Sequence, residues 1–85
     1  MMYTISWLIV AENDLADIWL AATDRNAVTR ASAEIDFLLS GDPLHLGRQL
    51  NSSIRRVFNH SPIGVIFEVV EDDKKVVVQA VYSTI

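Results

Sequence analysis

The side chains best able to do chemistry are three arginines and two histidines that lie close together in the sequence. Arg48, Arg55, Arg56, His45 and His60 all fall within residues 43–67, a stretch that contains no Asp or Glu. Guanidinium groups bind phosphates and carboxylates through paired hydrogen bonds, and a histidine can act as a general base near neutral pH. The cluster therefore fits an anion-binding or partner-binding patch, and it fits chance clustering of surface charge about equally well.

The candidate roles of these side chains differ. Adjacent residues of a strand point to opposite faces, so Arg55 and Arg56 cannot share a face, and their apolar neighbours do not decide which one faces the solvent. His60 is a candidate general base, although a lone histidine before a Ser-Pro turn is more often a loop residue. His45 and His60 with Asp42 have no metal-ligand spacing, and no phosphate loop or nucleophile elbow occurs. We therefore expect neither a metal nor a cofactor.

Charge is divided unevenly along the chain. The net charge of −4 argues against attraction of the whole protein to nucleic acid. Residues 1–42 contain seven acids against Arg25 and Arg30, whereas the acid-free segment that follows is basic. Only the basic segment, residues 43–67, remains a candidate for direct binding to nucleic acid.

The length and composition predict one small domain. The chain has 85 residues and no cysteine, so we expect a single domain over residues 1–85, without disulfides. The apolar run Trp7–Val10 is too short to cross a membrane, and the N-terminus lacks the basic region of a signal peptide. These features predict a cytoplasmic protein without membrane contact.

The stretch that should organise the fold is residues 52–82, which predicts three consecutive strands. Residues 63–70 are rich in β-branched and aromatic side chains, EDDK supplies a polar turn, and KVVVQAVY begins a second such run. Pro62 cannot donate to a strand ladder, so it marks the turn before this hairpin and leaves Ser52–Asn59 as the preceding strand.

Two amphipathic helices are predicted upstream of these strands. Asn13 or a neighbour can cap the first helix, and Thr23 or Asp24 can cap the second. The second helix should end at Gly41, where glycine permits a left-handed residue. The apolar stripes consist of Leu15, Ile18, Trp19 and Ala22 in the first helix and of Val28, Ala31, Ile35, Leu38 and Leu39 in the second.

The remaining segments complete the predicted topology. Tyr3–Val10 has apolar residues on both parities and is predicted as a buried strand, whereas residues 44–51 are predicted as an ordered loop. The expected fold is α+β with the order β-α-α-β-β-β. A two-helix hairpin packs on one face of a four-stranded, mainly antiparallel sheet.

Strict alternation divides the last two strands into two faces. Val65, Phe67, Val69, Val76, Val78, Ala80 and Tyr82 should face the helices. The opposite face, marked by Glu68 and Gln79, still carries Ile66, Val70, Val77 and Val81. Such an apolar face favours a covering partner or self-association, unless loops and termini cover it. The expected contact set is Arg48, Arg55, Arg56, Ile66, Val70, Val77 and Val81, with acidic partner residues meeting the arginines.

The order of elements and several motifs resemble the RelE/ParE superfamily of toxins from bacterial type II toxin–antitoxin modules. The resemblance covers nearly the whole chain and rests on YTISWLIVAENDLADIWLAA, Ile54-Arg55-Arg56-Val57, Ser61-Pro62-Ile63 and VIFEVVEDDKKVVVQAV. It implies a toxin that an antitoxin binds and neutralises, with a role in plasmid stabilisation. The target in the ParE branch is DNA gyrase, and the RelE branch cuts messenger RNA on the ribosome.

The sequence departs from the RNA-cutting branch at several positions. Gly64 stands where that branch has an arginine, and Ser83 or Thr84 stands where it has a basic residue. The sequence ends at Ile85, before a tail that often supplies a catalytic aromatic side chain, and Tyr82 is expected in the core. Enzymatic activity is therefore left open, and ParE-like or unassigned activity is favoured over RNA cleavage. The alternative is a binding module that keeps the toxin fold without toxicity.

Overall fold

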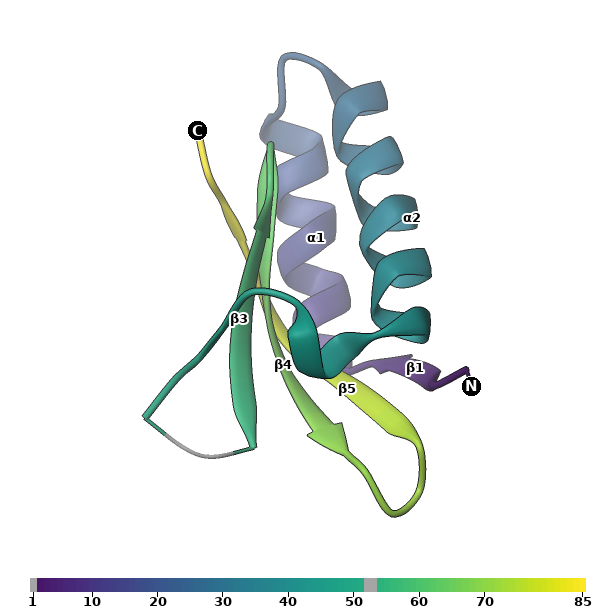
Figure 1. Cartoon of the computed structure of the whole chain (residues 1–85). Helices are drawn as coiled ribbons and strands as arrows, with labels where there is room; N and C mark the ends of the chain where they lie inside the picture. Colours follow the sequence, from purple (N-terminus) through teal and green to yellow (C-terminus); the bar gives the residue numbers. More distant parts are fainter. Residues whose placement is uncertain (1, 52–53) are drawn as a thin grey trace.

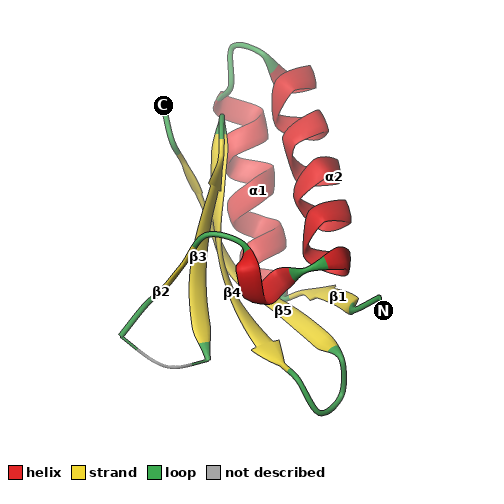
Figure 2. Ribbon diagram, viewed as in Figure 1, coloured by secondary structure: helices red, strands yellow, loops and turns green. Residues whose placement is uncertain are grey.

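Two helices pack on one face of a mixed five-stranded sheet (Figures 1 and 2). The computed structural model describes residues 2–51 and 54–85. The elements are β1 (Thr4–Trp7), α1 (Ile9–Ala21), α2 (Arg25–Gly41), a 3₁₀ turn (Pro43–His45), β2 (Arg48–Gln49), β3 (Arg55–His60), β4 (Ile63–Val70) and β5 (Lys75–Ser83).

The sheet has the order β1-β5-β4-β3-β2, in which β1 runs parallel to β5 and the other neighbours are antiparallel. This arrangement confirms the predicted two-layer α+β fold. The additional strand is the two-residue β2, which lies in the segment predicted as a loop. The predicted start of β3 at Ser52 lies outside the described residues.

The first strand is shorter than predicted. It ends at Trp7, and Ile9 and Val10, which we placed in the strand, form the first turn of α1 with 74% and 62% of their surface exposed. The cap is Leu8 rather than Asn13, and it provides no side-chain hydrogen bond. The apolar run has the composition of a buried strand. Its pairing with β5 nevertheless ends where the Leu8 N–H donates to the Val78 carbonyl, and the chain then turns into α1.

The second helix follows its predicted pattern closely. The Asp24 carboxylate accepts a hydrogen bond from the Ala27 N–H at 3.0 Å, which confirms Asp24 as the cap. Gly41 ends the helix without a left-handed conformation, contrary to expectation. Gly47 instead has a φ of +62°, and a Cβ there would lie 1.9 Å from the Val57 carbonyl oxygen. The backbone of the β2 segment can therefore approach β3 closely only at a glycine.

The core lies between the helices and one face of the sheet. Leu15, Ile18 and Ala22 of the α1 stripe pack against it, whereas Trp19 remains 38% exposed. The buried apolar residues are Ala11, Val28, Ala31, Ile35, Leu39, Ile63, Val65, Phe67, Val69, Val76, Val78 and Val81. Four members of the α2 stripe are in this set, as predicted, and Leu38 is half-buried.

A bulge in β5 changes the side to which its last residues point. Ile66 pairs with Ala80 but Phe67 pairs with Val78, so Gln79 is an extra residue on β5. Beyond the bulge the alternation is reversed, and Val81 pairs with Val65 and is buried in the core. Our placement of Val81 on the open side, and of Ala80 and Tyr82 against the helices, was therefore wrong.

A side chain from α1 takes the place of a neighbouring strand at the end of β5. The β1–β5 pairing covers Lys75–Val78, after which the chain leaves the sheet to form α1. The Val81 N–H donates to the Asp14 carboxylate at 3.1 Å. Because an unpaired N–H in a partly buried position is costly, this bond stabilises β5 beyond the bulge.

A polar cluster ties the β4–β5 turn to the start of the chain. Glu71 accepts bonds from the Lys74 ammonium at 2.5 Å and from the Tyr3 hydroxyl at 2.7 Å. The bond from Lys74 is the main reason that the pKa of Glu71 is lowered, while the same carboxylate raises the pKa of Tyr3 and of Lys74. The cluster is solvent-exposed, so it positions the turn and does not form a buried site.

Tyr82 lies across Gly64 on the side of the sheet away from the helices. A Cβ at Gly64 would stand 2.4 Å from the Tyr82 ring and 2.6 Å from the Asn59 side-chain oxygen. The Tyr82 hydroxyl donates to that same oxygen. Gly64 thus provides the space for the tyrosine ring.

The reversed alternation predicts unequal effects of introducing lysine at two valines of β5. Val81→Lys places a charge in the core and should lower the free energy of unfolding by at least about 3 kcal/mol. Val77→Lys, at a half-buried position on the other face, should lower it by less than about 1 kcal/mol. Urea unfolding of both variants measures the difference. Equal destabilisation would contradict the placement of Val81 in the core and Val77 on the other face.

Filling the space under Tyr82 should also destabilise the fold. Gly64→Ala is expected to cost about 1 to 3 kcal/mol, because the ring or the strand must shift. Gly41→Ala is the matched control, since nothing lies within 4 Å of its Cβ position. In a Tyr82→Ala background the Gly64→Ala penalty should become smaller. A penalty unchanged in that background would contradict the packing described for this pair.

Candidate functional site

The candidate site is the open face of the sheet, defined as the face opposite the helices. Strand register determines which side chains share it: Val57, Ile66 and Ala80 form one cross-strand row, which Arg48 extends. Side chains directly opposite each other on neighbouring strands point to the same face. The open face therefore carries Thr4, Ser6, Arg48, Arg55, Val57, Asn59, Gly64, Ile66, Glu68, Val70, Lys75, Val77, Ala80 and Tyr82.

The charged groups of the open face are mostly cationic. Arg48, Arg55 and Lys75 are exposed, and Glu68 is the one carboxylate among these described residues. Glu68 accepts a hydrogen bond from the Gln79 amide at 2.8 Å. The acids of residues 1–42 lie instead on the helix layer and its connections. The uneven charge of the sequence thus becomes a difference between the two faces of the molecule.

The register separates the two adjacent arginines of β3. Arg55 lies opposite Glu68 on the open face and, within the described ranges, makes no ion pair. Arg56 points to the helix side, where its guanidinium donates to the carbonyls of Leu46 and Gly47 at 3.0 and 3.3 Å. Arg56 therefore holds the segment that carries Arg48, and Arg55 is the arginine available to a ligand of the open face.

A shallow hollow of about 330 Å³ lies at one end of the open face. Gly47, Arg48, Val57, Asn59 and Tyr82 line it. The guanidinium, the amide and the phenol can bind an anionic or hydrogen-bonding group, and the tyrosine ring offers a flat apolar surface. Sequence analysis missed Asn59 and misplaced Tyr82. The polar Gln79 inside an apolar run was the available signal of a bulge.

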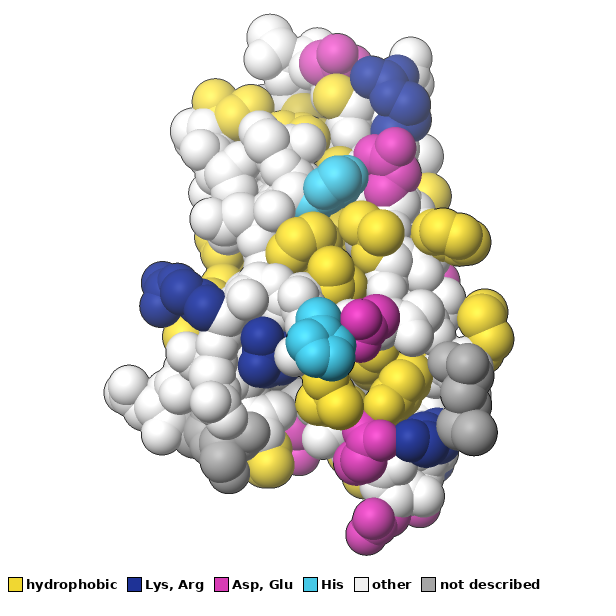
Figure 3. Space-filling view, viewed as in Figure 1, with side chains coloured by type: hydrophobic (Ala, Val, Ile, Leu, Met, Phe, Trp, Pro, Cys, Tyr) yellow, Lys and Arg dark blue, Asp and Glu magenta, His cyan; other side chains and the backbone are white. Residues whose placement is uncertain are grey.

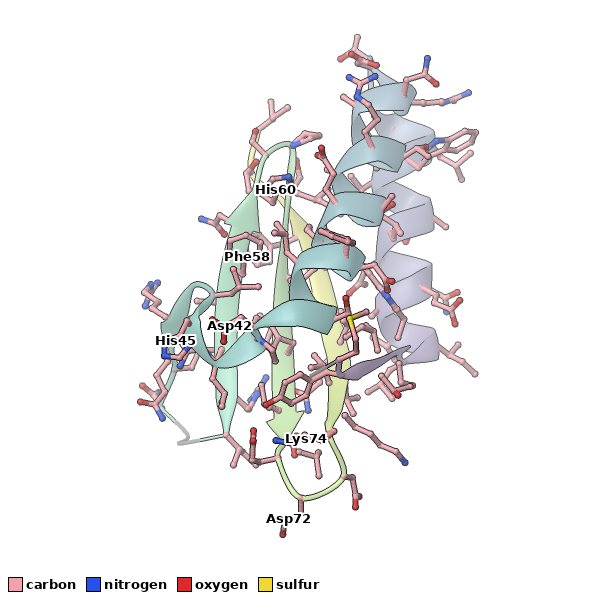
Figure 4. The ribbon with its side chains drawn as sticks, turned by 45° about the vertical axis from the view of Figure 1, so that its right-hand side comes forward. Asp42, His45, Phe58, His60, Asp72 and Lys74 are labelled. Atoms are coloured by element: carbon pink, nitrogen blue, oxygen red, sulfur yellow. The ribbon has the colours of Figure 1, made fainter. Side chains whose placement is uncertain are left out.

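Neither histidine lies on the open face. His60 points from the end of β3 toward α2, where its Nε2 lies 3.0 Å from the Glu34 carboxylate, and its ring stacks on Phe58 (Figure 4). His45 pairs with Asp42 at 2.8 Å. Apolar side chains lie between the two histidines on this side of the molecule (Figure 3). The structure therefore does not bring His60 together with Arg48 and Arg55.

The apolar part of the open face is only half-buried. Val57, Ile66, Val70, Val77 and Ala80 all have intermediate exposure. Ile66, Val70 and Val77 keep their predicted place, whereas Val81 belongs to the core. The surface combines an apolar centre with cations at its edges, which suits binding of an acidic, partly apolar segment.

Two other kinds of site find no support in the described residues. No three His, Asp or Glu side chains within residues 2–51 and 54–85 converge as metal ligands would. In the same ranges no helix is both long and apolar enough to cross a membrane.

Comparison with known proteins identifies the fold. No protein-family model and no curated protein sequence matches the chain. The toxin–antitoxin complex RelBE2 from Mycobacterium tuberculosis is similar in structure, with a TM-score of 0.80 and 20% identity over 98% of this chain and 99% of the other.

Two further solved structures point the same way. The chromosomal ParDE toxin–antitoxin system from P. aeruginosa has a TM-score of 0.67 and 16% identity, with 96% of each chain covered. A mutant of the E. coli toxin RelE in the free state has a TM-score of 0.69 and 12% identity, with 98% of this chain and 84% of that chain covered. Together these similarities show that the chain has the fold of the RelE/ParE superfamily of toxins.

Proposed function

We propose that this protein is the toxin component of a bacterial toxin–antitoxin pair, that it works in the cytoplasm, and that an antitoxin covers its open face. The observation that carries the proposal is an apolar open face with Arg48 and Arg55 at its edges, on a toxin fold. RelBE2 is a toxin–antitoxin complex and ParDE is a toxin–antitoxin system, which supports a protein partner of this kind.

The chemistry of the open face supports an antitoxin segment with acidic residues. Arg48 and Arg55 are exposed and lie on neighbouring strands, in adjacent cross-strand rows of the open face. Carboxylates can pair with these guanidinium groups, while apolar side chains of the same segment cover Val57, Ile66 and Val77. Arg56 contributes indirectly, because it holds the segment that carries Arg48.

The same geometry supports a toxin that binds its target rather than one that cuts RNA. Cleavage through a ribose 2′-hydroxyl requires a positioned base, and the only carboxylate among the described open-face residues already accepts a bond from Gln79. His60 is held on the opposite side by Glu34. The net charge of −4 also gives little steering toward ribosomal RNA. A protein target such as gyrase is therefore favoured.

One observation favours RNA cleavage as a second candidate function. The hollow formed by Arg48, Asn59 and Tyr82 combines a phosphate-binding group with an aromatic ring that can stack on a base. The third possibility is a protein with the toxin fold but no toxicity. The Tyr82 ring packs over Gly64 and leaves no space for a basic side chain at this position.

Growth on induced expression separates these readings. We expect induction in a bacterial host to arrest growth and to accumulate gyrase–DNA complexes while messenger RNA stays intact. Co-expression of a cognate antitoxin encoded by a neighbouring reading frame should restore growth. Growth without arrest, with the protein folded and soluble, would identify a non-toxic module. Messenger RNA cut on the ribosome, and lost in an Arg48→Ala variant, would identify the second candidate.

Antitoxin affinity tests the proposed surface itself. Arg55→Glu and Val77→Lys should each weaken antitoxin binding by at least about tenfold, because the first opposes acidic partner residues and the second charges the apolar centre. Arg30→Glu on the exposed side of α2 is the control and should change the affinity by less than about threefold. Isothermal titration calorimetry measures all three. Equal losses for Arg30→Glu and Arg55→Glu would exclude the open face as the antitoxin site.

A further inference from the structure

A hollow of about 680 Å³ lies at the end of the molecule where the α1–α2 connection, the β3–β4 turn and the last residues of the chain come together (Figure 1). Its volume falls within the range of about 300–1,000 Å³ that is typical of small-molecule sites. None of its described lining residues belongs to the open face. The hollow is therefore separate from the proposed antitoxin surface.

The wall of the hollow is largely apolar. Val28 of α2 is buried, and Ile18, Ala22, Ala27 and Pro62 are half-buried around the same hollow. The short alanine side chains leave space between the two helices and the β3–β4 turn. A ligand with a hydrocarbon body would remove the apolar surface of this wall from water, which favours its binding.

The charge at the hollow is negative. Asp17 and Asp24 line it, and no Lys, Arg or His is among its described lining residues. Asp17 makes no ion pair in the part of the chain that the structure describes. Asp24 uses its Oδ1 to cap α2, so its Oδ2 can accept a hydrogen bond from a ligand. Two carboxylates beside an apolar wall complement a cation that has an apolar body.

The end of α1 adds to this negative potential. The carbonyls at the C-terminus of a helix carry a partial negative charge, and α1 has no basic residue in its last turn. The nearest cation in the sequence is Arg25, which donates to the Trp19 and Leu20 carbonyls and stacks over the Trp19 ring. Neither Trp19 nor Leu20 lines the hollow. The charge of Arg25 is therefore held on another side of α1.

We propose that this hollow binds a small organic cation, in which an ammonium group is carried on a hydrocarbon body. The ammonium group pairs with the carboxylates of Asp17 and Asp24, and the hydrocarbon body covers the apolar wall. The hydroxyl oxygens of Ser61 and Ser83, which also line the hollow, can accept further hydrogen bonds from the ammonium group. The site depends neither on toxicity nor on the antitoxin.

Probes that share one hydrocarbon body separate the effect of charge from that of apolar contact. Phenethylammonium carries the cation, 2-phenylethanol is its neutral counterpart, and 3-phenylpropionate is an anion of similar size. We expect phenethylammonium to shift the backbone amide NMR signals of Ala22 and Ser83 saturably, with a Kd of about 1 mM or tighter. The neutral probe should bind at least about fivefold more weakly, and the anion should not bind.

Three results of this titration would overturn the proposal. They are the absence of saturable binding by phenethylammonium, equal binding of all the probes, and signal shifts centred on the open face instead of on the hollow.

A matched pair of double variants ties the binding to the two carboxylates. Asp17→Asn with Asp24→Asn keeps the shape of both side chains, and asparagine still caps a helix. This variant should weaken phenethylammonium binding by at least about fivefold and change 2-phenylethanol binding by less than about twofold. Asp72→Asn with Asp73→Asn removes the same charge from the exposed β4–β5 turn at the other end of the molecule, and it should change either affinity by less than about twofold. Equal weakening by the two double variants would contradict the site.

Discussion

The hydrogen bond from the Val81 N–H to the Asp14 carboxylate joins α1 to the part of β5 that no longer pairs with β1. The strand β1 accompanies β5 only as far as Val78, after which α1 must supply a partner for the exposed edge. Asp14 does so from the middle of α1. Because it accepts from Val81, the strand beyond the Gln79 bulge keeps its reversed alternation, with Val81 in the core and Tyr82 on the open face.

The reversed alternation of β5 determines which of its last side chains lie on the open face. The reversal brings Tyr82 over Gly64 and beside Asn59, next to Arg48 from the β2 segment. The tyrosine ring then fills the space over Gly64, so that even a Cβ at residue 64 would collide with it. Among the described residues, the open face has cations at its edges, and its one carboxylate, Glu68, already accepts a hydrogen bond from Gln79; the proposed binding role rests on this composition.

Much of the fold could be predicted from the sequence because its elements follow simple periods. The 3.6-residue stripe of α2 and its Asp24 cap, and the alternation of β4, obey local rules that hold in the structure. The assignment of Val81 and Tyr82 failed because the period of two assumes an uninterrupted ladder, and one extra residue at Gln79 reverses it.

The candidate site was harder to predict because it depends on pairings between distant segments. Arg55 and Arg56 are equivalent in the sequence, and only the register with Glu68 and Phe67 separates them. Arg48 reaches the open face through a two-residue strand that no period marks, and Arg56 holds it there through the Leu46 and Gly47 carbonyls. Asn59 belongs to the site because the Tyr82 hydroxyl donates to it, a contact that depends on the reversed alternation of β5.

Amide hydrogen exchange at Val81 is the most direct test of the constraint on which the open face depends. In the wild-type protein this N–H should exchange slowly, near the rate of global unfolding, because Asp14 accepts its hydrogen bond. In Asp14→Ala it should exchange at least about tenfold faster than the neighbouring core amides, and Asp17→Ala should leave it unchanged. Slow exchange at Val81 that persists in Asp14→Ala would contradict the account.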